Sequence, residues 1–283
     1  MEDVDFSITI LSNGETVEIS PQSVFRPLSA EGFACGDYGV TTDENMLIDG
    51  SYIHSRRLNA RLLVISFEIF PIYESEKYRS RLIHFLNLKN DFTVTVIRNG
   101  VKRSIDCVLK SSKIIQPTLR SAVTAEIAFL CPMPYFADDR EEIYSNSTVV
   151  PLFTFPFNSV KGYGITMGKS YRTNVFNVEN YGDTDIGVTV SIYASGKVVN
   201  PKISCGDQYI KITDSMKNGD VYMVSTEPGN KRIEKNGVGN FCFDRSSVFF
   251  SVPRGSSTIT ITADSGVDFI RSVLSYSERY LGI

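Results

Sequence analysis

The side chains best suited to acid–base, nucleophilic or metal chemistry are scarce in this sequence and are not spaced for it. Histidine occurs twice among the 283 residues, as His54 and His84. Metal sites and nucleophilic triads need a histidine with converging cysteine or carboxylate partners, and neither histidine has such a neighbour at the required spacing. We therefore interpret both as surface histidines and predict no metal site.

Paired carboxylates form one suggestive cluster, Asp138, Asp139, Glu141 and Glu142. A glycosidase pair needs a cleft in which one acid has a raised pKa, whereas these acids are adjacent in a segment that we expect to be a solvated linker. The Asn-Gly and Gly-Asp turns of the second half lack the spaced aspartates of a calcium loop. The sequence also contains no nucleophile-elbow, P-loop or zinc-protease motif. We name no catalytic, cofactor-binding or metal-binding residue, and we expect a protein that is not an enzyme and needs no cofactor.

Aromatic side chains of the second half offer a binding alternative, because sandwich and jelly-roll domains often stack sugars on aromatic platforms. The chain has no tryptophan, and its 14 tyrosines and 18 phenylalanines are spread over both halves. Aromatic residues in such numbers mostly fill cores and interfaces, so we favour those positions over a glycan platform. The candidates for a platform are Tyr193, Tyr209, Tyr222, Phe241, Phe249 and Phe250.

Composition places the chain among ordinary globular proteins. Hydrophobic residues make up 42% and charged residues 22%, which is enough for a sizeable core. The formal net charge of -3 disfavours binding driven by nucleic-acid phosphates. We find no long apolar run and no basic start followed by one, so we expect neither membrane insertion nor a secretory signal. Five scattered cysteines without a C-x-x-C pair indicate synthesis in a reducing cytosol.

Residues 122–136 organise the first half of the chain. They begin as a strand whose alternate residues, from Val123 to Cys131, are apolar, and two prolines then stop it. Asn13-Gly14 and Asn99-Gly100 each join alternating segments and predict hairpins. Residues 58–70 predict a long strand. We interpret the end of this region, near residue 137, as the end of a first domain.

One helix and one irregular segment complete the first half. Residues 74–88 predict the helix, because Tyr78, Leu82, Phe85 and Leu86 recur at helical spacing, and it should cover the open face of a sheet. Residues 20–57 are rich in glycine and proline and are long for a loop in a compact domain. We expect them to form an extended arm or belt that packs on another molecule.

The second half consists of short apolar runs separated by turn signals at about 10-residue intervals, which is typical of a β-sandwich or jelly roll. The expected fold is therefore mainly β: a β-sandwich or split-barrel with one α-helix, followed by a galectin-like or jelly-roll sandwich. We predict the first domain at 1–137, a linker at 138–151 and the second domain at 152–283.

The order of several segments resembles the distal tail protein family (Dit) of long-tailed phages, a siphophage tail-component family. The resemblance covers most of the chain. The segments are Asp49-Gly50-Ser51-Tyr52, Arg61 leading the strand 62–70, the helix with Arg81-Leu82-Ile83-His84-Phe85-Leu86-Asn87, residues 92–100, the strand that ends with residues 129–136, Asn180-Tyr181-Gly182-Asp183, and Arg279-Tyr280-Leu281-Gly282-Ile283. Met133 stands where the family often has an acidic or small residue.

The resemblance implies an architecture and a role. In this family an N-terminal β domain with one helix and a belt precedes a galectin-like sandwich, and six copies form a ring at the distal end of the tail. The implied partners are further copies in a homo-hexamer, the tail tube protein, a tail-associated hub or lysin protein and a receptor-binding protein. DNA only passes through such a ring. The implied location is the virion, after synthesis in the bacterial cytoplasm.

Three hypotheses follow. The first is a structural virion protein, a distal tail or baseplate hub ring that joins the tail tube to the tail-tip or host-adsorption apparatus. The second is a glycan-binding adhesion module of a tail or cell-surface assembly, and the third is a hydrolase with an unrecognised site. A six-fold particle would favour the first, and a monomer that binds cell-wall polysaccharide would favour the second.

Overall fold

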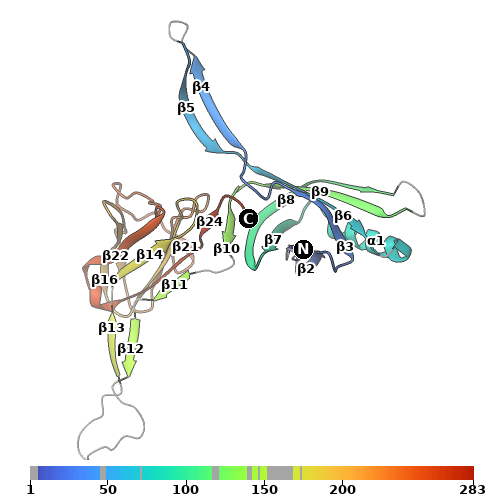
Figure 1. Ribbon diagram of the computed structural model, residues 1–283. Coiled ribbons are helices and arrows are strands. Elements are labelled where there is room, and N and C mark those ends of the chain that lie inside the picture. Colours follow the sequence, from blue (N-terminus) through green and yellow to red (C-terminus); the bar gives the residue numbers. More distant parts are fainter. Residues whose placement is uncertain are drawn as a thin grey trace, which may run out of the picture. The chain divides into compact units, whose positions relative to one another are not determined.

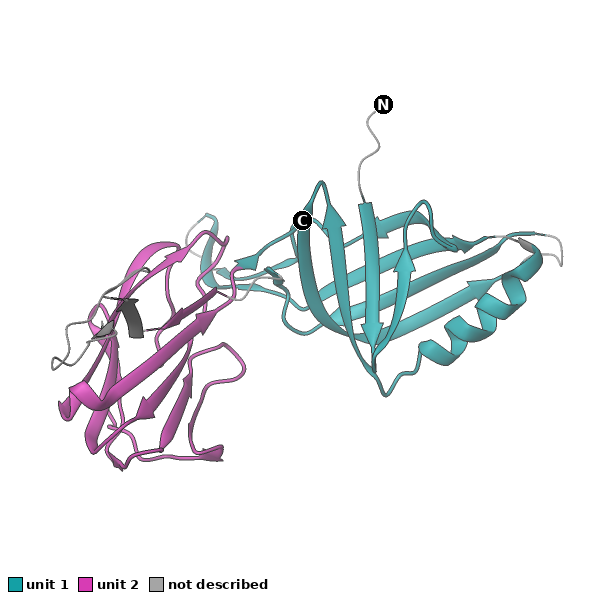
Figure 2. Ribbon diagram, turned by 90° about the horizontal axis from the view of Figure 1, so that it is seen from below, with its two compact units in different colours: residues 1–139, 279–283 teal, residues 140–278 magenta. Residues whose placement is uncertain are grey.

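The computed structural model describes residues 6–44, 49–70, 72–116, 121–138, 142–145, 147–151, 168–172 and 174–283. Strands dominate these residues, and α1 is the one α-helix among them, so the predicted mainly β fold with a single helix is confirmed. The chain divides into two compact units, residues 1–139 with 279–283, and residues 140–278 (Figure 2). No described helix has both the length and the apolar composition needed to cross a membrane.

The first unit is a closed barrel. Its strands pair in the order β1-β2-β3-β6-β9-β8-β7, and β7 pairs with β1 to complete the circle. β2 and β3 meet in parallel at one residue pair, and the other neighbours are antiparallel. Closure leaves these strands few open edges. Their bounds are β1 Phe6–Ser12, β2 Glu15–Ile19, β3 Phe25–Glu31, β6 Arg61–Ile69, β7 Asp91–Arg98, β8 Val101–Ile115 and β9 Val123–Cys131.

Alternation of side chains builds the barrel core. The inward residues of β9, from Val123 to Cys131, are all buried, as the period-2 pattern predicts. Aromatic rings fill the interior: Phe25 packs edge-on against Phe67 with ring centres 5.4 Å apart, and Phe92 lies 5.4 Å from Phe129. Such ring pairs stabilise the core beyond their buried area.

The helix α1 (Ser75–Phe85) follows a short 3-10 turn at Ile72–Glu74 and is shorter than the predicted 74–88. It ends where the Leu86 N–H bonds the Leu82 carbonyl, and residues 87–90 form a turn. Leu82 and Phe85 are buried, and the Phe85 ring lies 5.7 Å from that of Phe92. The helix therefore covers the aromatic core, as its apolar spacing indicates (Figure 2).

Both Asn-Gly hairpins predicted in the first half are confirmed. Asn13 and Gly14 have φ of 49° and 81°, and Asn99 and Gly100 have φ of 51° and 78°. Two successive positive φ values define the turn that matches the twist of a hairpin. These turns join β1 to β2 and β7 to β8.

The predicted arm at 20–57 is partly wrong. Residues 25–31 are β3, which pairs with β6 inside the barrel because Phe25 contributes to the core. The projecting part consists of β4 (Tyr38–Glu44) and β5 (Ser51–Leu58), which form a two-stranded sheet (Figure 1). We call residues 38–58 the arm.

The second unit is built from antiparallel sheets around its own core. One sheet has the order β11-β23-β15-β19-β20-β21 and another β14-β22-β16-β17, with β18 beside β16; β12 and β13 pair separately. The bounds are β11 Glu142–Ser145, β12 Ser147–Pro151, β13 Gly168–Arg172, β14 Val175–Asn180, β15 Thr189–Ala194, β16 Val198–Cys205, β17 Gln208–Lys211, β18 Ser215–Met216, β19 Val221–Ser225, β20 Arg232–Lys235, β21 Val238–Gly239, β22 Gly255–Ser265 and β23 Ile270–Tyr276.

Two segments differ from the predicted division of the chain. Within the expected linker 138–151, β11 pairs with β23 and is part of the second unit. Residues 279–283, expected in the second domain, belong to the first unit. There β24 (Arg279–Tyr280) pairs with β10 (Phe136–Asp138), which in turn pairs with β8. We call residues 279–283 the return segment.

Candidate interaction surfaces

The residues first considered for chemistry do not converge. His54 lies on the exposed arm, where its Nδ1 is 3.5 Å from Asp43 Oδ2, and His84 is on the exposed side of α1. Within the described ranges, no group of three or more histidine, cysteine or acidic side chains could hold a metal ion. Of the acidic cluster, Asp139 and Glu141 lie outside the described residues, and Glu142 is exposed on β11.

The arm exposes apolar side chains on a part of the chain that has no core of its own. Tyr38, Val40, Tyr52 and Ile53 are each more than half exposed. A two-stranded hairpin is marginally stable in water by itself, and exposed apolar groups of this size mark contact surfaces. The arm therefore has the properties of a segment that packs on another molecule.

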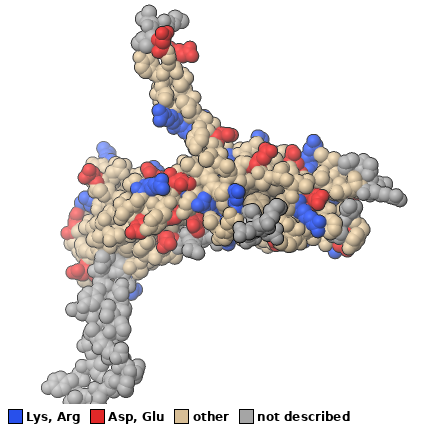
Figure 3. Space-filling model, in the orientation of Figure 1, with Lys and Arg blue, Asp and Glu red and all other residues tan. Residues whose placement is uncertain are grey.

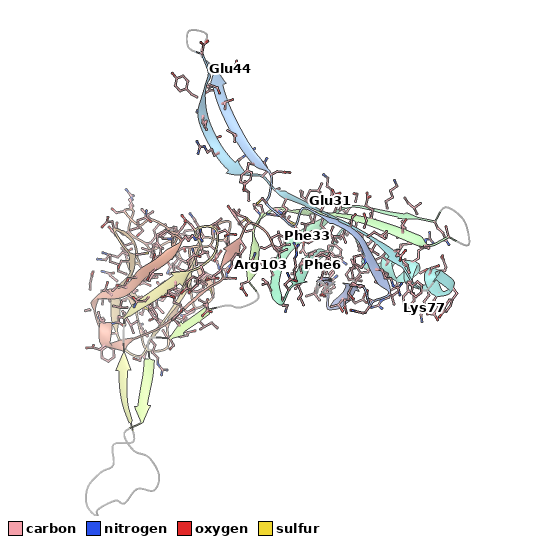
Figure 4. All side chains as sticks on the ribbon, in the orientation of Figure 1. Phe6, Glu31, Phe33, Glu44, Lys77 and Arg103 are labelled. Carbon is pink, nitrogen blue, oxygen red and sulfur yellow. The ribbon has the colours of Figure 1, made fainter. Side chains whose placement is uncertain are left out.

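Charge is distributed unevenly along the arm. Arg56 and Arg57 lie near its foot, where they pair with Val40 and Gly39, whereas Asp43, Glu44 and Asp49 lie toward the far end. Figure 3 shows this separation, and Figure 4 places Glu44 at the far end of the arm and Phe33 near its foot. A partner that contacts the whole arm would thus meet a basic stem and an acidic tip.

The foot of the arm is organised by Arg61, the first residue of β6, whose side chain is only 2% exposed. Its Nη1 donates to the carbonyl oxygens of Gly32 and Ala34, both at 2.6 Å, and its Nε donates to the Pro134 oxygen at 2.9 Å. Nη2 donates to the Leu281 oxygen at 2.5 Å. Burial lowers the pKa of Arg61 from its ordinary value, but a guanidinium stays protonated in proteins.

Sequence reasoning did not assign this role to Arg61. The alternation of β6 places residue 61 on the same inward face as Leu63, Ile65 and Phe67. An arginine on a buried face must find several acceptors, because an unpaired buried charge is costly. The inward position of Arg61 in the alternation of β6 was therefore the feature of the sequence from which this role could be inferred.

The return segment occupies the same region. The Arg103 guanidinium lies 3.5 Å from the centre of the Tyr280 ring and donates to the Gly282 oxygen. Arg98 donates to the Ile283 oxygen at 3.3 Å. The Ile283 N–H donates to the Phe33 oxygen at 3.0 Å. Residues 279–283 are therefore held by side chains and backbone of the barrel and of the arm's foot.

The second unit contains an open cavity of about 730 Å³, which polar groups from several loops and strands line. Of the proposed aromatic platform, Phe249 and Phe250 line it, but Phe250 is buried. Tyr222 lies in the core, and Phe241 is 89% exposed outside the cavity lining. The lining residues are Asp185, Cys205, Gly206, Asp207, Gln208, Val248, Phe249, Phe250, Ser251, Pro253, Ser257 and Thr258.

A polar cluster in the same unit has shifted pKa values and serves a structural role. The buried Tyr222 hydroxyl donates to Asp214 Oδ2 at 2.6 Å, and Lys235 Nζ donates to the same oxygen at 2.7 Å. These hydrogen bonds lower the pKa of Asp214, whereas burial and Asp214 raise that of Tyr222. Asn240 Nδ2 donates to the Tyr222 oxygen at 2.9 Å, so the cluster ties β19 to β20 and the following loop.

Comparison with known proteins bears on these surfaces. Residues 181–280 match the family model of the siphovirus-type tail component, C-terminal domain, so the resemblance to siphophage tail components is confirmed. No protein of curated function matches the chain in sequence.

Solved structures match nearly the whole chain. The crystal structure of the SPP1 Dit (gp 19.1) protein, described as a paradigm of the hub adsorption apparatus in phages infecting Gram-positive bacteria, is similar with a TM-score of 0.63 and 13% identity, covering 96% of this chain and 98% of that one. The activated phage P2 baseplate, solved with calcium and with strontium, gives a TM-score of 0.53 and 9% identity in both cases, with the same coverage. At these identities the likeness concerns the fold.

Proposed function

We propose that this chain, a relative of the siphovirus-type tail components, is a structural virion protein that forms the hub ring at the distal end of a phage tail. Six copies would close the ring, which joins the tail tube to the tail-tip or host-adsorption apparatus. The single observation that carries this proposal is the arm, which projects from a closed barrel with apolar residues exposed along both of its strands.

A ring requires two different surfaces on each copy that fit one another. The arm is one of them. The outward side chains of β6 and β9 offer the other, because Leu62 pairs with Leu130 and Val64 with Ala128 in neighbouring rows of the barrel wall, and all four are only partly buried. An arm of one copy lying on the wall of the next makes a head-to-tail contact, and such contacts generate rings when the rotation closes.

The remaining assignments follow from this role. A protein with a net charge of -3 would let DNA pass without gripping it, because neutralisation of phosphates by lysine and arginine drives DNA binding. The partners would be the tube protein, a hub or lysin protein and a receptor-binding protein. All five cysteines are free thiols, as expected after synthesis in a reducing bacterial cytoplasm.

Removal of the arm's apolar contacts tests the ring. A variant with Tyr38, Val40, Tyr52 and Ile53 replaced by serine should remain folded, because these side chains lie outside both cores, but should not form hexamers in native mass spectrometry. The matched control replaces Val238 and Phe241, which are even more exposed and lie in the second unit, and should leave the hexamer intact. Hexamers that persist in the arm variant would contradict the assignment of the arm.

A second candidate function is glycan binding by the second unit, favoured by its open cavity. Carboxylate, amide and hydroxyl groups from Asp185, Gln208 and Thr258 line it, and such groups can bond sugar hydroxyls. Cell-wall polysaccharide added to the isotope-labelled protein should then shift the amide signals of residues 205–208 and 257–258. Shifts elsewhere, or none at saturating polysaccharide, would exclude this cavity as a glycan site.

A further inference from the structure

Residues 279–283 lie against residues of the first unit that bond their main chain at several points. Three arginines from three strands donate to main-chain oxygens of the return segment: Arg61 on β6 to that of residue 281, Arg103 on β8 to that of 282 and Arg98 on β7 to that of 283. Phe33 and Phe136 stack at 6.2 Å beside them. We call Phe33, Arg61, Arg98, Arg103 and Phe136 the docking groove.

We propose that the docking groove is a specific peptide-binding site for the return segment, and that its occupancy fixes the foot of the arm. The binding step stands on the contacts of the first unit alone. The consequence for ring assembly rests on the proposed function.

The groove selects the sequence of the return segment. Tyr280 pairs with Phe136 in the β10–β24 ladder and places its ring under the Arg103 guanidinium. A Cβ added to Gly282 would lie 3.0 Å from the Ala34 carbonyl carbon and oxygen, which is tighter than nine in ten real Cβ contacts, so a larger residue there must push the main chain at residue 34 aside. Ile283 packs against the barrel core. The contacts thus favour a stacked aromatic residue at position 280, a glycine at 282 and an aliphatic residue at 283.

The groove and the arm share one guanidinium. Arg61 binds the carbonyl oxygens of Gly32 and Ala34, which lead into the arm, and also that of Leu281. Ile283 donates to Phe33 in the same stretch. Without the return segment, one N–H group of the buried Arg61 would lose its acceptor, which is costly, and the chain between β3 and β4 would lose its hydrogen bond from Ile283 to Phe33.

Binding also links the arm to the progress of synthesis. The return segment follows the whole second unit in the chain, so the foot of the arm cannot be completed until residues 140–278 have been made. An unfinished chain would carry an arm without a fixed direction. Under the proposed function, such a chain would not enter the ring.

The first test uses a chain that stops at Glu278 and measures amide hydrogen exchange. Exchange in residues 38–44 and 51–58 should accelerate at least tenfold, while the barrel strands β1 and β7 keep their protection. A synthetic peptide with the sequence of residues 277–283 should restore the slow exchange. A Kd on the order of 0.1–1 mM would suffice, because in the intact chain tethering presents the segment at an effective concentration on the order of mM. The same peptide with valine in place of Gly282 should not bind.

A second variant guards against misfolding of the truncated chain. Gly282→Val in the intact chain should accelerate exchange in the arm, whereas Gly239→Val, where an added Cβ meets nothing within 4 Å, should not. The proposal would be overturned if the amide exchange rates of the arm, in both the truncated chain and Gly282→Val, stayed within twofold of those in the unmodified protein. Loss of protection in β1 and β7 together with the arm in Gly282→Val would also overturn it, because the segment would then serve folding in general.

Ring formation is scored separately by native mass spectrometry. Hexamers that survive with an unanchored arm would contradict the arm's role in the ring, while leaving the docking groove supported by the exchange and peptide measurements.

Discussion

Arg61 and Leu281 are 220 positions apart in the sequence, and a hydrogen bond of 2.5 Å joins the guanidinium of the first to the carbonyl oxygen of the second. The same guanidinium bonds carbonyls at residues 32, 34 and 134. One side chain therefore connects the foot of the arm, the end of β9 and the return segment. Arginine, whose planar guanidinium carries five N–H donors, is the only residue whose side chain can bond four such acceptors at once.

The first prediction concerns the stability of the first unit when Arg61 is replaced. Arg61→Ala should lower its free energy of unfolding by about 3 kcal/mol or more, because four buried or partly buried hydrogen bonds from a charged donor to carbonyl oxygens are lost. Arg61→Lys should cost about 1.5–3 kcal/mol, since an ammonium group keeps the charge but cannot reproduce the fork. Urea unfolding followed by signals of the barrel provides the measurement.

Arg79→Ala is the control for this series. Arg79 pairs with Glu76 on the exposed surface of α1, where such pairs contribute at most about 1 kcal/mol. Equal costs for Arg61→Lys and Arg79→Ala would show that the network around Arg61 does not hold the foot of the arm.

The second prediction separates the arm from the barrel. Replacing residues 38–58 by Asn-Gly should leave the barrel folded, because the Asn59 N–H already bonds the Asp37 oxygen at 2.9 Å and a short turn can join these residues. Deleting 20–57 should abolish folding of the unit, because it removes β3 and the Phe25 ring that contacts Phe67. Circular dichroism and thermal unfolding of the two deletions provide the comparison, and similar behaviour of both would contradict the closed barrel.

The arm also illustrates what the sequence could predict. Glycines and prolines in residues 20–57 indicated irregular structure, and the resemblance to a tail family suggested a belt. The alternation within Phe25–Glu31 is weak, since only Phe25 is buried, so nothing local distinguished β3 from its surroundings. Its place in the barrel depends on pairing with β6, and the sequence of a single segment does not predict which distant strand it pairs with.

Other parts of the fold could be predicted from the sequence because their signals are local. The Asn-Gly turns, the alternation of β9 and the helical spacing around Leu82 are each decided within a few residues. The docking groove could not be predicted from the sequence, because its parts come from distant segments, including β6, β7, β8 and residues 279–283. Arg279 to Ile283 were noticed as a family resemblance, but their return to the first unit depends on the whole fold.

The third prediction concerns the polar cluster of the second unit. Asp214→Asn should lower the free energy of unfolding by about 1–2 kcal/mol near pH 7, because it weakens two charge-assisted hydrogen bonds. The effect stays this small because the Lys235 and Asp214 side chains are 25% and 31% exposed, so water partly screens their charges. The control is Asp264→Asn, whose partner Lys211 is at 2.9 Å but whose carboxylate is half exposed; it should cost less.

The pH dependence of the same cluster has a defined sign. The pKa of Asp214 is lowered by Lys235 and Tyr222, so its contribution is fully present above the unfolded value of about 3.9 and is lost as the pH falls through the folded value. The pKa of Lys235 is raised, chiefly by Asp214, so that contribution is lost only as the pH rises above its ordinary range. Stability of the second unit should be flat from about pH 5 to 9 and fall below about pH 4, and Asp214→Asn should reduce the acid-side loss. An unchanged acid limb in the variant would show that other carboxylates dominate.

The fourth prediction concerns the reactivity of the Cys131 thiol, which a lowered pKa would increase and burial would decrease. A hydrogen bond from Cys107 and the nearby charge of Arg61 lower the pKa of Cys131, which by itself would make it the more reactive thiol. Its side chain is completely buried, however, whereas Cys35 and Cys242 are exposed. Iodoacetamide at neutral pH should therefore modify Cys35 and Cys242 within minutes, and Cys131 only at the rate at which the barrel opens. Mass spectrometry of tryptic peptides over time, with and without urea, gives the order of modification. Rapid modification of Cys131 in the native protein would mean that the end of β9 opens locally, and because Arg61 pairs with Cys131 in the β6–β9 ladder, it would place that opening at the foot of the arm.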